Sequence, residues 1–447
     1  MFLDFMFEKF KENGTNDAII WKDKSYSYKW ILSRIFEWQK IIDTHDIASG
    51  SVAILEADFS PNSIALFLSL IEKGCTLVPL TSSVEVKKPE FIEIAQGEVS
   101  FQIDKNDNFT IKKLDHLADH QYYQKLKELG HPGLVVFSSG STGKNKASVH
   151  DLVPLLEKYK VPRHTLRTIT FLLYDHLGGV NTMLYTLSNA GCIVTVQDRN
   201  PDAVLRIIEK HKVELLPSSP TFLNLVLLSE VYKKYNLSTL KTVTYGTEPM
   251  PEGTLKRLNK ILPKVKFVQT YGLSEVGVLR AKSKSSDSLW VKIGGEGFET
   301  KIVEGILWIK AKSAMYGYLN APSPFTEDGW LITGDVVEQD GEYIRILGRK
   351  SEIINVGGEK VYPVEVENVI QDMEGVEDVM VGGEPNPITG QIVTAKVKLS
   401  TNETLSEFRK RMRMFCKDKL QNFKIPQKVI IVSDDLYSER FKKIRAN

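Results

Sequence analysis

The sequence predicts an α/β protein. A large N-terminal domain of layered, mostly parallel sheets with a small β-barrel-like subdomain is followed by a small, mobile α+β domain. Strand-length apolar runs alternate with longer amphipathic segments, as in 51–55, 62–73 and 76–79. This alternation is typical of parallel sheets covered by helices. Later in the chain, short strands separated by turn residues, as in 305–310 and 342–346, indicate antiparallel structure.

The same alternation continues through the middle of the chain. Apolar runs at 168–173, 193–196 and 213–216 are predicted strands, and the segments 178–189 and 201–210 between them are predicted helices. Runs that are apolar at nearly every position fit strands covered on both faces. We therefore expect a layered architecture in this region too.

A domain boundary is expected near residue 349, so that residues 1–349 form the large domain and residues 350–447 the small one. The elements beyond the boundary make a compact set of about the size of an independent small domain. We expect these elements at 361–373, 379–381, 391–399, 405–419 and 428–432.

The composition excludes several classes of protein. The chain has 447 residues, of which 42% are hydrophobic and 26% charged, and its net charge is +2. These values are typical of soluble globular proteins and give no reason to expect a nucleic-acid partner. No run of about 18 apolar residues occurs and the N-terminus lacks a signal-peptide core, so no membrane span is expected. Three scattered cysteines suit a reducing compartment, and we expect the cytoplasm.

An apolar strand runs into a loop of small hydroxyl residues and glycines that ends in two lysines. Glycines let backbone N–H groups face an anion, hydroxyls add donors and lysine supplies charge, so the loop predicts phosphate binding. A Walker loop is excluded because Ser138 stands at its first glycine position and Asn145 follows Lys144. A dinucleotide fingerprint is excluded because Thr300 replaces the third glycine after the cluster at 294–297.

Three further segments carry polar side chains suited to a nucleotide site. Residues 269–277 combine an aromatic ring, glycines, a hydroxyl and a carboxylate, which could stack a base, admit a phosphate and hold Mg²⁺. Residues 328–335 end in Thr-Gly-Asp, and residues 348–367 begin with Gly-Arg. Taken singly, each motif is also compatible with an ordinary surface loop.

In this order the four motifs resemble those of the AMP-forming adenylating enzymes: acyl-CoA synthetases, stand-alone adenylation domains and beetle luciferases. The family carries a Ser/Gly phosphate loop, Tyr-Gly-x-Thr-Glu, Thr-Gly-Asp and a Gly-Arg segment ending in Pro-x-Glu-Val-Glu. This chain has Leu273-Ser274 in place of x-Thr. The stretch from 25–28 to 74–80 resembles the family's opening, so the resemblance covers nearly the whole chain and is strongest to short acyl-CoA or aryl-CoA synthetases.

The resemblance implies a role for each matching residue. Tyr271 would pack on the adenine, Ser274 would bond the α-phosphate and Glu275 would bind Mg²⁺. Asp335 would accept both ribose hydroxyls, and Arg349 would donate to the sugar side. The β- and γ-phosphates would be held by Ser138, Ser139, Gly140, Ser141, Thr142, Gly143 and Lys146, and the adenine-side loop would be Gly246-Thr247-Glu248-Pro249.

At the C-terminus the resemblance places Lys443 in the catalytic position, where the family's lysine contacts the charge developing at the carboxylate and the α-phosphate. The surrounding segment, 436–445, lacks the family's proline and glycine. Two further departures are Asn145, where the phosphate loop usually has proline, and Ser351, where the hinge usually has aspartate or lysine. A small polar residue still permits rotation at the hinge, which would bring Gly357-Gly358 toward a thiol.

The acid pocket is expected around 174–179, 218–221 and 276–277. The order Asp-His-x-Gly-Gly resembles acyl-CoA and aryl-CoA synthetases, in which the histidine abuts the substrate carboxylate, and this favours His176 as a catalytic residue. An alignment shifted by one residue instead puts Asp175 where amino-acid-activating domains pair with the α-ammonium group. In a third interpretation, His176 only caps a helix.

The resemblance implies that the chain joins a carboxylic acid to AMP, releases pyrophosphate and transfers the acyl group to a thiol, in the first place that of CoA. ATP, Mg²⁺ and CoA would take part. Two alternatives stay open: an enzyme that loads an acyl carrier protein through its pantetheine arm, and a catalytically silent homologue that binds a nucleotide or an acyl group. The sequence names neither the acid, the thiol nor the oligomeric state.

Overall fold

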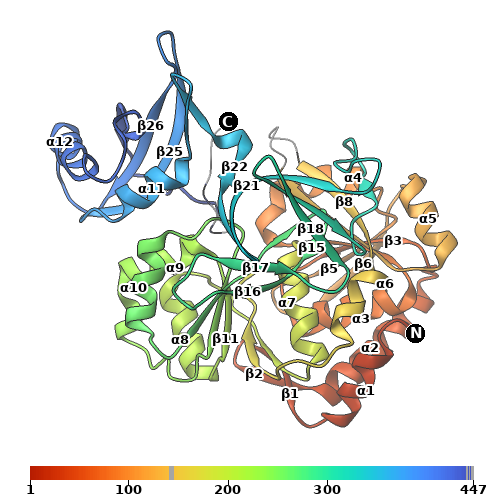
Figure 1. The fold of residues 1–447 in the computed structure, drawn as a ribbon. Coiled ribbons are helices and arrows are strands. Elements are labelled where there is room, and N and C mark those ends of the chain that lie inside the picture. Colours follow the sequence, from red (N-terminus) through yellow and green to blue (C-terminus); the bar gives the residue numbers. More distant parts are fainter. Residues whose placement is uncertain (140–144, 439–440, 442, 444–447) are drawn as a thin grey trace.

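The computed structural model describes residues 1–139, 145–438, 441 and 443. Two seven-stranded sheets form the large N-terminal part of the molecule, and an antiparallel six-stranded sheet follows them in the chain. A five-stranded sheet forms a separate lobe near the C-terminus (Figure 1). The described chain therefore has the large and small parts that the predicted fold class requires.

The first seven-stranded sheet has the order β13-β12-β11-β9-β10-β1-β2. Its neighbouring strands run parallel except β1 and β2, so most of its connections are helices that cross from one strand to the next. Its strands are β1 (Asp17–Trp21), β2 (Lys24–Ser27), β9 (Arg167–Ile169), β10 (Cys192–Val194), β11 (Leu215–Ser218), β12 (Thr242–Tyr245) and β13 (Lys266–Gln269).

The second seven-stranded sheet has the order β20-β8-β7-β4-β3-β5-β6. Its centre, from β7 to β5, is parallel, and the strands at both edges are antiparallel. Its strands are β3 (Val52–Glu56), β4 (Thr76–Leu80), β5 (Val99–Ile103), β6 (Phe109–Lys113), β7 (Gly133–Ser139), β8 (Asn145–Asp151) and β20 (Gly317–Tyr318).

Helices cover both sheets, because the apolar faces of the sheets and of the helices are buried against one another. One core joins the two sheets through α1, α2, α3 and α7; α8, α9 and α10 cover the first sheet, while α4 and α5 cover the second. The N-terminal helices are α1 (Asp4–Glu12), α2 (Tyr28–Thr44), α3 (Pro61–Lys73), α4 (Lys88–Ile94), α5 (Gln121–Leu129), α6 (Leu152–Leu156), α7 (Leu177–Ser188), α8 (Pro201–His211), α9 (Pro220–Ser229) and α10 (Glu252–Ile261), with short 3₁₀ turns η1 (Ser82–Lys87), η2 (Glu157–Tyr159) and η3 (Val231–Lys233).

The antiparallel six-stranded sheet occupies the place of the predicted barrel-like subdomain and has its own apolar core. Its order is β16-β17-β22-β21-β19-β18, and a two-stranded ribbon of β14 and β15 precedes it in the chain. The strands are β14 (Gly272–Leu273), β15 (Gly277–Val278), β16 (Arg280–Ser283), β17 (Val291–Gly294), β18 (Phe298–Val303), β19 (Ile306–Ala311), β21 (Leu331–Asp340) and β22 (Tyr343–Arg349).

The C-terminal lobe has a separate core, in which α11 and α12 pack on its sheet. The sheet order is β24-β23-β26-β25, with β27 beside β26, and the lobe follows β22 through η4 (Lys350–Glu352) (Figure 1). Its elements are β23 (Ile354–Val356), β24 (Glu359–Val361), α11 (Pro363–Gln371), β25 (Val376–Asn386), β26 (Gly390–Leu399), α12 (Leu405–Cys416), η5 (Asn422–Lys424) and β27 (Lys428–Ile431). The exact boundary between residues 349 and 350 stays a prediction.

One predicted strand is shorter than expected. The apolar run at 168–173 predicted six residues of strand, but β9 spans only Arg167–Ile169. Beyond it the chain leaves the sheet toward Tyr174, which is buried and donates a hydrogen bond to the carbonyl oxygen of Ala57 at 2.8 Å. Phe171 is therefore buried in an irregular segment and not in a strand, while Leu172 and Leu173 are only partly buried.

No helix in the described part of the chain is long and apolar enough to cross a membrane. The three cysteines, Cys75, Cys192 and Cys416, are buried free thiols, as their scattered positions predicted.

Candidate active site

Several of the predicted site residues follow strands of the first seven-stranded sheet. β11 pairs with β12 so that Ser218 lies opposite Tyr245, and β12 pairs with β13 so that Tyr245 lies opposite Gln269. These strands are parallel, so the segments after them leave the sheet at the same edge. The predicted adenine-side loop, the 270–275 segment and part of the acid pocket are thereby brought together.

The predicted phosphate loop is flanked by β7 and β8, which pair as antiparallel strands. Ser138 pairs with Lys146, and Ser139 pairs with Asn145. Asn320 holds the returning strand: its Oδ1 accepts from the N–H of Ala147 at 3.0 Å, and its Nδ2 donates to the carbonyl oxygen of Asn145 at 2.9 Å. The predicted phosphate ligands Gly140, Ser141, Thr142 and Gly143 lie outside the described residues.

Tyr318 connects the phosphate lysine to the predicted metal ligand. Its strand β20 pairs with β8, which places the Tyr318 ring 5.1 Å from the Lys146 ammonium group. The Tyr318 hydroxyl donates a hydrogen bond to Oε1 of Glu275. Burial and the neighbouring Glu275 carboxylate raise the pKa of Tyr318, so the hydroxyl keeps the proton that it donates.

Glu275 suits a metal that shares its coordination with a substrate. In the ranges that the structure describes, no cluster of three or more His, Cys, Asp or Glu side chains could hold a metal ion. Mg²⁺ commonly binds through one or two carboxylates together with substrate phosphates and water, and such a site needs only one protein carboxylate. A single Glu275, connected to Lys146 through Tyr318, therefore fits Mg²⁺ bound with a nucleotide.

Tyr271, Asp335 and Arg349 form a second polar group. The Tyr271 hydroxyl donates to Oδ2 of Asp335, and the Nε of Arg349 lies 3.0 Å from Oδ1 of the same carboxylate. Burial raises the pKa of Asp335, and Arg349 opposes that shift. β21 and β22 pair Asp335 directly with Arg349, so the sheet itself fixes their separation. A carboxylate has about four acceptor directions, which leaves capacity for ribose hydroxyls.

The adenine-side loop has a backbone that few residues tolerate. A Cβ on Gly246 would lie 2.5 Å from Oγ1 of Thr270, so only glycine allows this approach. Thr247 has a φ of 72°. Glu248 is held inward, because its Oε1 accepts from the N–H of Thr221 at 2.7 Å, and burial raises its pKa.

Ser274 lies in the turn between β14 and β15 and is partly exposed. It directly precedes Glu275 in the turn, at the same sheet edge. This position fits its predicted contact with the α-phosphate, which stays a prediction.

The tail residue Lys443 reaches the site with its main chain only. Its N–H donates to Oε2 of Glu248 at 3.2 Å. Its ammonium group turns into the C-terminal lobe, 2.6 Å from the carbonyl oxygen of Val379, 3.3 Å from Oδ1 of Asp378 and 3.8 Å from Oε2 of Glu367. The structure therefore places the predicted catalytic lysine beside the site with its side chain directed elsewhere.

His176 begins α7 without capping it through its side chain. His176 is the N-cap residue of α7: its backbone carbonyl accepts from Gly179 and Val180, while its partly exposed ring makes no side-chain cap bond. Asp175 is buried, and its Oδ2 accepts from the hydroxyl of Thr81 at 2.7 Å. Asp175 thus anchors the start of η1, and the roles of Asp175 and His176 toward the acid both stay predictions.

Profiles of two protein-family domains match this chain. The sequence profile of the AMP-binding enzyme family matches residues 6–319, and that of the AMP-binding enzyme C-terminal domain matches residues 365–443. The chain belongs to the AMP-binding enzyme family. This confirms the resemblance on which the predicted roles depend.

The curated relatives of this AMP-binding enzyme include ligases of CoA. An indoleacetate–CoA ligase of Aromatoleum aromaticum is 28% identical over 341 residues, which make up 70% of this chain and 66% of the relative. A mitochondrial medium-chain acyl-CoA ligase of Rattus norvegicus is 26% identical over 354 residues, or 72% of this chain and 57% of the relative. The chain thus spans less than two thirds of the length of these relatives.

Solved structures support the fold of this AMP-binding enzyme. An anthranilate CoA ligase in complex with anthranoyl-AMP has a TM-score of 0.83 at 18% identity, covering 99% of this chain and 95% of that one. An amide bond synthetase from Marinactinospora thermotolerans has a TM-score of 0.78 at 19% identity, covering 97% and 96%. At such low identity the likeness shows the fold alone.

The predicted thiol-facing turn of this AMP-binding enzyme lies on the C-terminal lobe. Gly357 and Gly358 join β23 to β24 with φ angles of 60° and 93°, a backbone that favours two glycines in a two-residue hairpin. Both are exposed, and the Gly357 N–H bonds to the carbonyl oxygen of Thr389 in the same lobe. The turn is thus available on the surface of the lobe.

Sequence reasoning missed Tyr318, Asn320 and Phe441. The Phe441 ring packs 5.4 Å from Phe171 and 5.5 Å from Phe222, and so anchors the C-terminal tail in the core of the large domain. No spacing in the sequence relates these residues to their partners, because the partners lie far away in the chain. A pairing of β20 with β8 could be found only from the structure.

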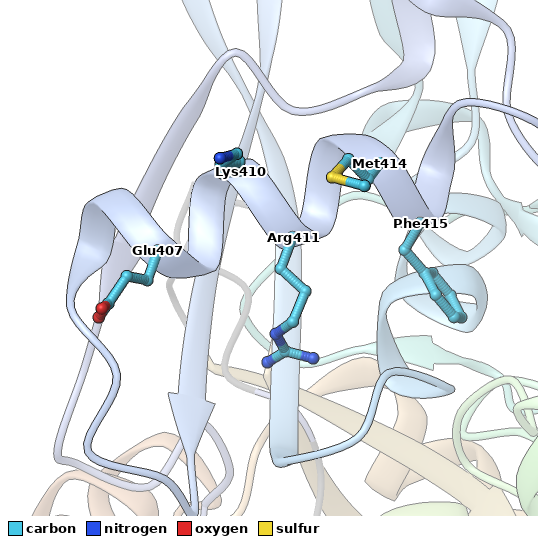
Figure 2. Close-up of a pocket in the computed structure, with 5 residues that line it drawn as sticks. All are labelled: Glu407, Lys410, Arg411, Met414 and Phe415. Atoms are coloured by element: carbon cyan, nitrogen blue, oxygen red, sulfur yellow. The ribbon is translucent and has the colours of Figure 1, made fainter.

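One surface hollow lies away from the residues of this site. It follows one side of α12 in the C-terminal lobe (Figure 2). It is lined by Glu407, Lys410, Arg411, Met414 and Phe415.

Proposed function

We propose that this enzyme activates a carboxylic acid with ATP and then transfers the acyl group to a thiol, in the first place that of CoA. The observation that carries the proposal is the presence of two polar groups around one sheet edge. The group of Lys146, Tyr318 and Glu275 suits phosphates and Mg²⁺, and the group of Tyr271 and Asp335 suits the nucleoside. An extended ATP molecule has its phosphates at one end and its nucleoside at the other, which matches these two groups.

In the first half-reaction a carboxylate oxygen would attack the α-phosphorus of ATP, and the bond to the bridging oxygen of the β-phosphate would break. Lys146 would hold the departing pyrophosphate, Ser274 would hold the α-phosphate and His176 would orient the acid. Mg²⁺ at Glu275 would neutralise phosphate charge. The protein supplies no nucleophile, so catalysis would rest on positioning and electrostatics.

Lys443 would join this half-reaction after a rotation of its side chain. Its main chain already lies against Glu248. A lysine side chain is a flexible four-carbon stem that can rotate. The ammonium group of Lys443 is held by acceptors of the C-terminal lobe in this structure. The negative charge developing at the α-phosphate would compete with these acceptors for the ammonium group.

In the second half-reaction the thiol sulfur would attack the acyl carbonyl carbon, the bond to the AMP oxygen would break and AMP would leave. The exposed Gly357-Gly358 turn would move to the site as the C-terminal lobe turns, and its lack of side chains would leave room for a pantetheine arm. Relatives that are named CoA ligases favour CoA as the acceptor.

An ATP–pyrophosphate exchange assay over a broad panel of carboxylic acids tests the first half-reaction. We expect exchange that depends on an acid and on Mg²⁺. Adding CoA or a holo-carrier protein to the accepted acid then tests the thiol: a CoA thioester supports the proposal, and loading of the carrier alone supports the carrier-protein alternative. Absence of exchange with every acid, while ATP still binds, would favour a catalytically silent homologue.

A further inference from the structure

A narrow cavity lies against α7, the helix that begins directly after His176. One face of α7 lines it with Leu177, Val180, Asn181 and Leu184, and Gly277 lies across from this helix. The first of these residues follows His176 directly in the chain. The spacing of three and four residues places them on one face of α7, so that Asn181 lies farther along the helix from His176 than Leu177 does.

The cavity has a polar group at one position and apolar walls elsewhere. The Lys158 ammonium group donates to Oδ1 of Asn181 at 2.6 Å and to the carbonyl oxygen of Val278 at 3.2 Å. The hydroxyl of the buried Tyr159 donates to the same Asn181 oxygen at 3.0 Å. These two bonds use two of the three ammonium donors of Lys158.

Lys158 has no carboxylate to balance its charge. Within residues 1–139 and 145–438 it forms no salt bridge, and both of its acceptors are neutral. Desolvation lowers its pKa to about 8, and the positive charge of Arg280 adds to this effect. A cation in such surroundings is costly unless an anion joins it. Nothing in the proposed chemistry of ATP uses this lysine.

We propose that Lys158 binds a second anionic group at the far end of the acid, so that the preferred substrate is a dicarboxylic or similarly anion-tailed acid. The inference rests on the proposed function. The five residues from His176 to Asn181 span about 7.5 Å along α7, which sets the approximate separation between the two anionic groups. A six-carbon dicarboxylate and a para-substituted benzoate are of about this length.

The walls must move to admit such a tail. In this structure the cavity has about 10 Å³ of free volume, enough for about one water molecule. Leu155 partly fills the space: its Cδ2 lies 3.4 Å from where a Gly277 Cβ would be. Rotation of the Leu155 side chain would widen the cavity next to Gly277, which has no side chain.

Matched acids test the inference. Pyrophosphate exchange is measured with adipate and hexanoate, and with terephthalate and 4-methylbenzoate, on the wild type, Lys158→Met and Lys158→Arg. The wild type should prefer the anion-tailed member of a pair by about tenfold to hundredfold in kcat/KM. Lys158→Met should abolish this preference mainly through KM, and Lys158→Arg should retain part of it.

Lys160→Met is the control, because Lys160 is about half exposed on the same segment and pairs with Glu157. It should leave the preference unchanged. Equal use of both acids by the wild type would overturn the inference and leave the proposed function intact, and so would an equal loss for both acids in Lys158→Met.

A binding measurement separates the inference from the proposed function. The thermal shift produced by adipate without ATP is compared between the wild type and Lys158→Met, with the melting temperature of each free protein as a check on folding. A shift that requires Lys158 supports the inference even if no acid supports exchange. A shift that is the same in both proteins, or absent from both, overturns it.

Discussion

Lys443 has its main chain at the proposed active site and its ammonium group in the C-terminal lobe. If the side chain turns toward the developing charge at the α-phosphate, Lys443→Ala should lower acid-dependent pyrophosphate exchange by about a hundredfold or more, because one preorganised charged donor is lost. Thioester formation from chemically prepared acyl-AMP should change little, since that step does not need the lysine.

The matched variant for Lys443 is Lys443→Arg, which keeps the charge and should retain part of the exchange activity. Lys424→Ala removes another lysine of the C-terminal lobe, one that pairs with Glu365, and serves as the control. Exchange at the wild-type rate in Lys443→Ala would show that the eroded tail motif has no catalytic lysine.

His150 gives a prediction about stability and pH. It is fully buried in β8, and desolvation lowers its pKa to about 4, so the folded protein holds it neutral. The unfolded chain takes up a proton near the ordinary value of about 6.5, and stability is therefore lost as the pH falls from about 6.5 toward 4. His150 should account for about 2 kcal/mol of unfolding free energy lost between pH 7 and pH 5.

Denaturant unfolding of the wild type and of His150→Leu at several pH values measures this contribution. The variant should lose less stability on acidification, although the difference at pH 7 also contains the change in packing. If the unfolding free energies of the two proteins fell equally with decreasing pH, His150 would not take up a proton on unfolding. His116, which is exposed, is the control position.

At the scale of single elements, the start of α7 depends on one glycine. A Cβ on Gly179 would lie 1.9 Å from the carbonyl oxygen of Leu173, whereas a Cβ on Gly178 would meet only the end of the Leu172 side chain at 3.4 Å. Gly179→Ala must therefore displace the backbone beside His176, at a cost of about 1–3 kcal/mol or more. Gly178→Ala should be neutral or stabilise the helix by up to about 1 kcal/mol.

Thermal unfolding and exchange kinetics of the two glycine variants check this. We expect Gly179→Ala to lower both the melting temperature and kcat/KM for the acid, and Gly178→Ala to retain the melting temperature. Equal behaviour of the two variants would mean that the turn before α7 adjusts freely.

The order and type of most elements could be predicted from the sequence because each is encoded locally. The helix expected at 62–73 is α3, which Ser60 caps and Gly74 ends, and the strand expected at 391–399 is β26. Local signals failed for the apolar residues after Ile169, since an irregular apolar segment and a buried strand can have the same composition.

The motifs predicted that Asp335 and Arg349 lie together, but they did not predict the contacts that connect the site. Asp335 and Arg349 were expected together near the sugar, and the strand pairing places them together. Tyr318 has no motif of its own, and its contacts with Lys146 and Glu275 follow from the pairing of β20 with β8 across about 170 residues. The direction of the Lys443 side chain likewise depends on acceptors in another lobe.

At the scale of the whole molecule, several contacts join the C-terminal lobe to the large domain. Asn224 of α9 donates to the carbonyl oxygen of Glu377 at 3.2 Å, and Phe441 packs into the large domain. A Cβ on Gly253 of α10 would lie 2.9 Å from Cγ of Asp372, which directly follows α11. If the lobe must turn between the two half-reactions, these contacts have to break.

A disulfide across this interface tests the rotation. In the double variant Gly253→Cys/Asp372→Cys, the two Cβ atoms would lie within about 4.4 Å of one another, which suits a disulfide, and the three native thiols are buried. The oxidised protein should retain pyrophosphate exchange, because the tail stays at the site, and should lose CoA thioester formation by about a hundredfold until a reductant is added. Each single cysteine variant should keep both activities. Full thioester formation in the oxidised protein would show that both half-reactions proceed in the arrangement described, and the Gly357-Gly358 turn would then have no part in receiving the thiol.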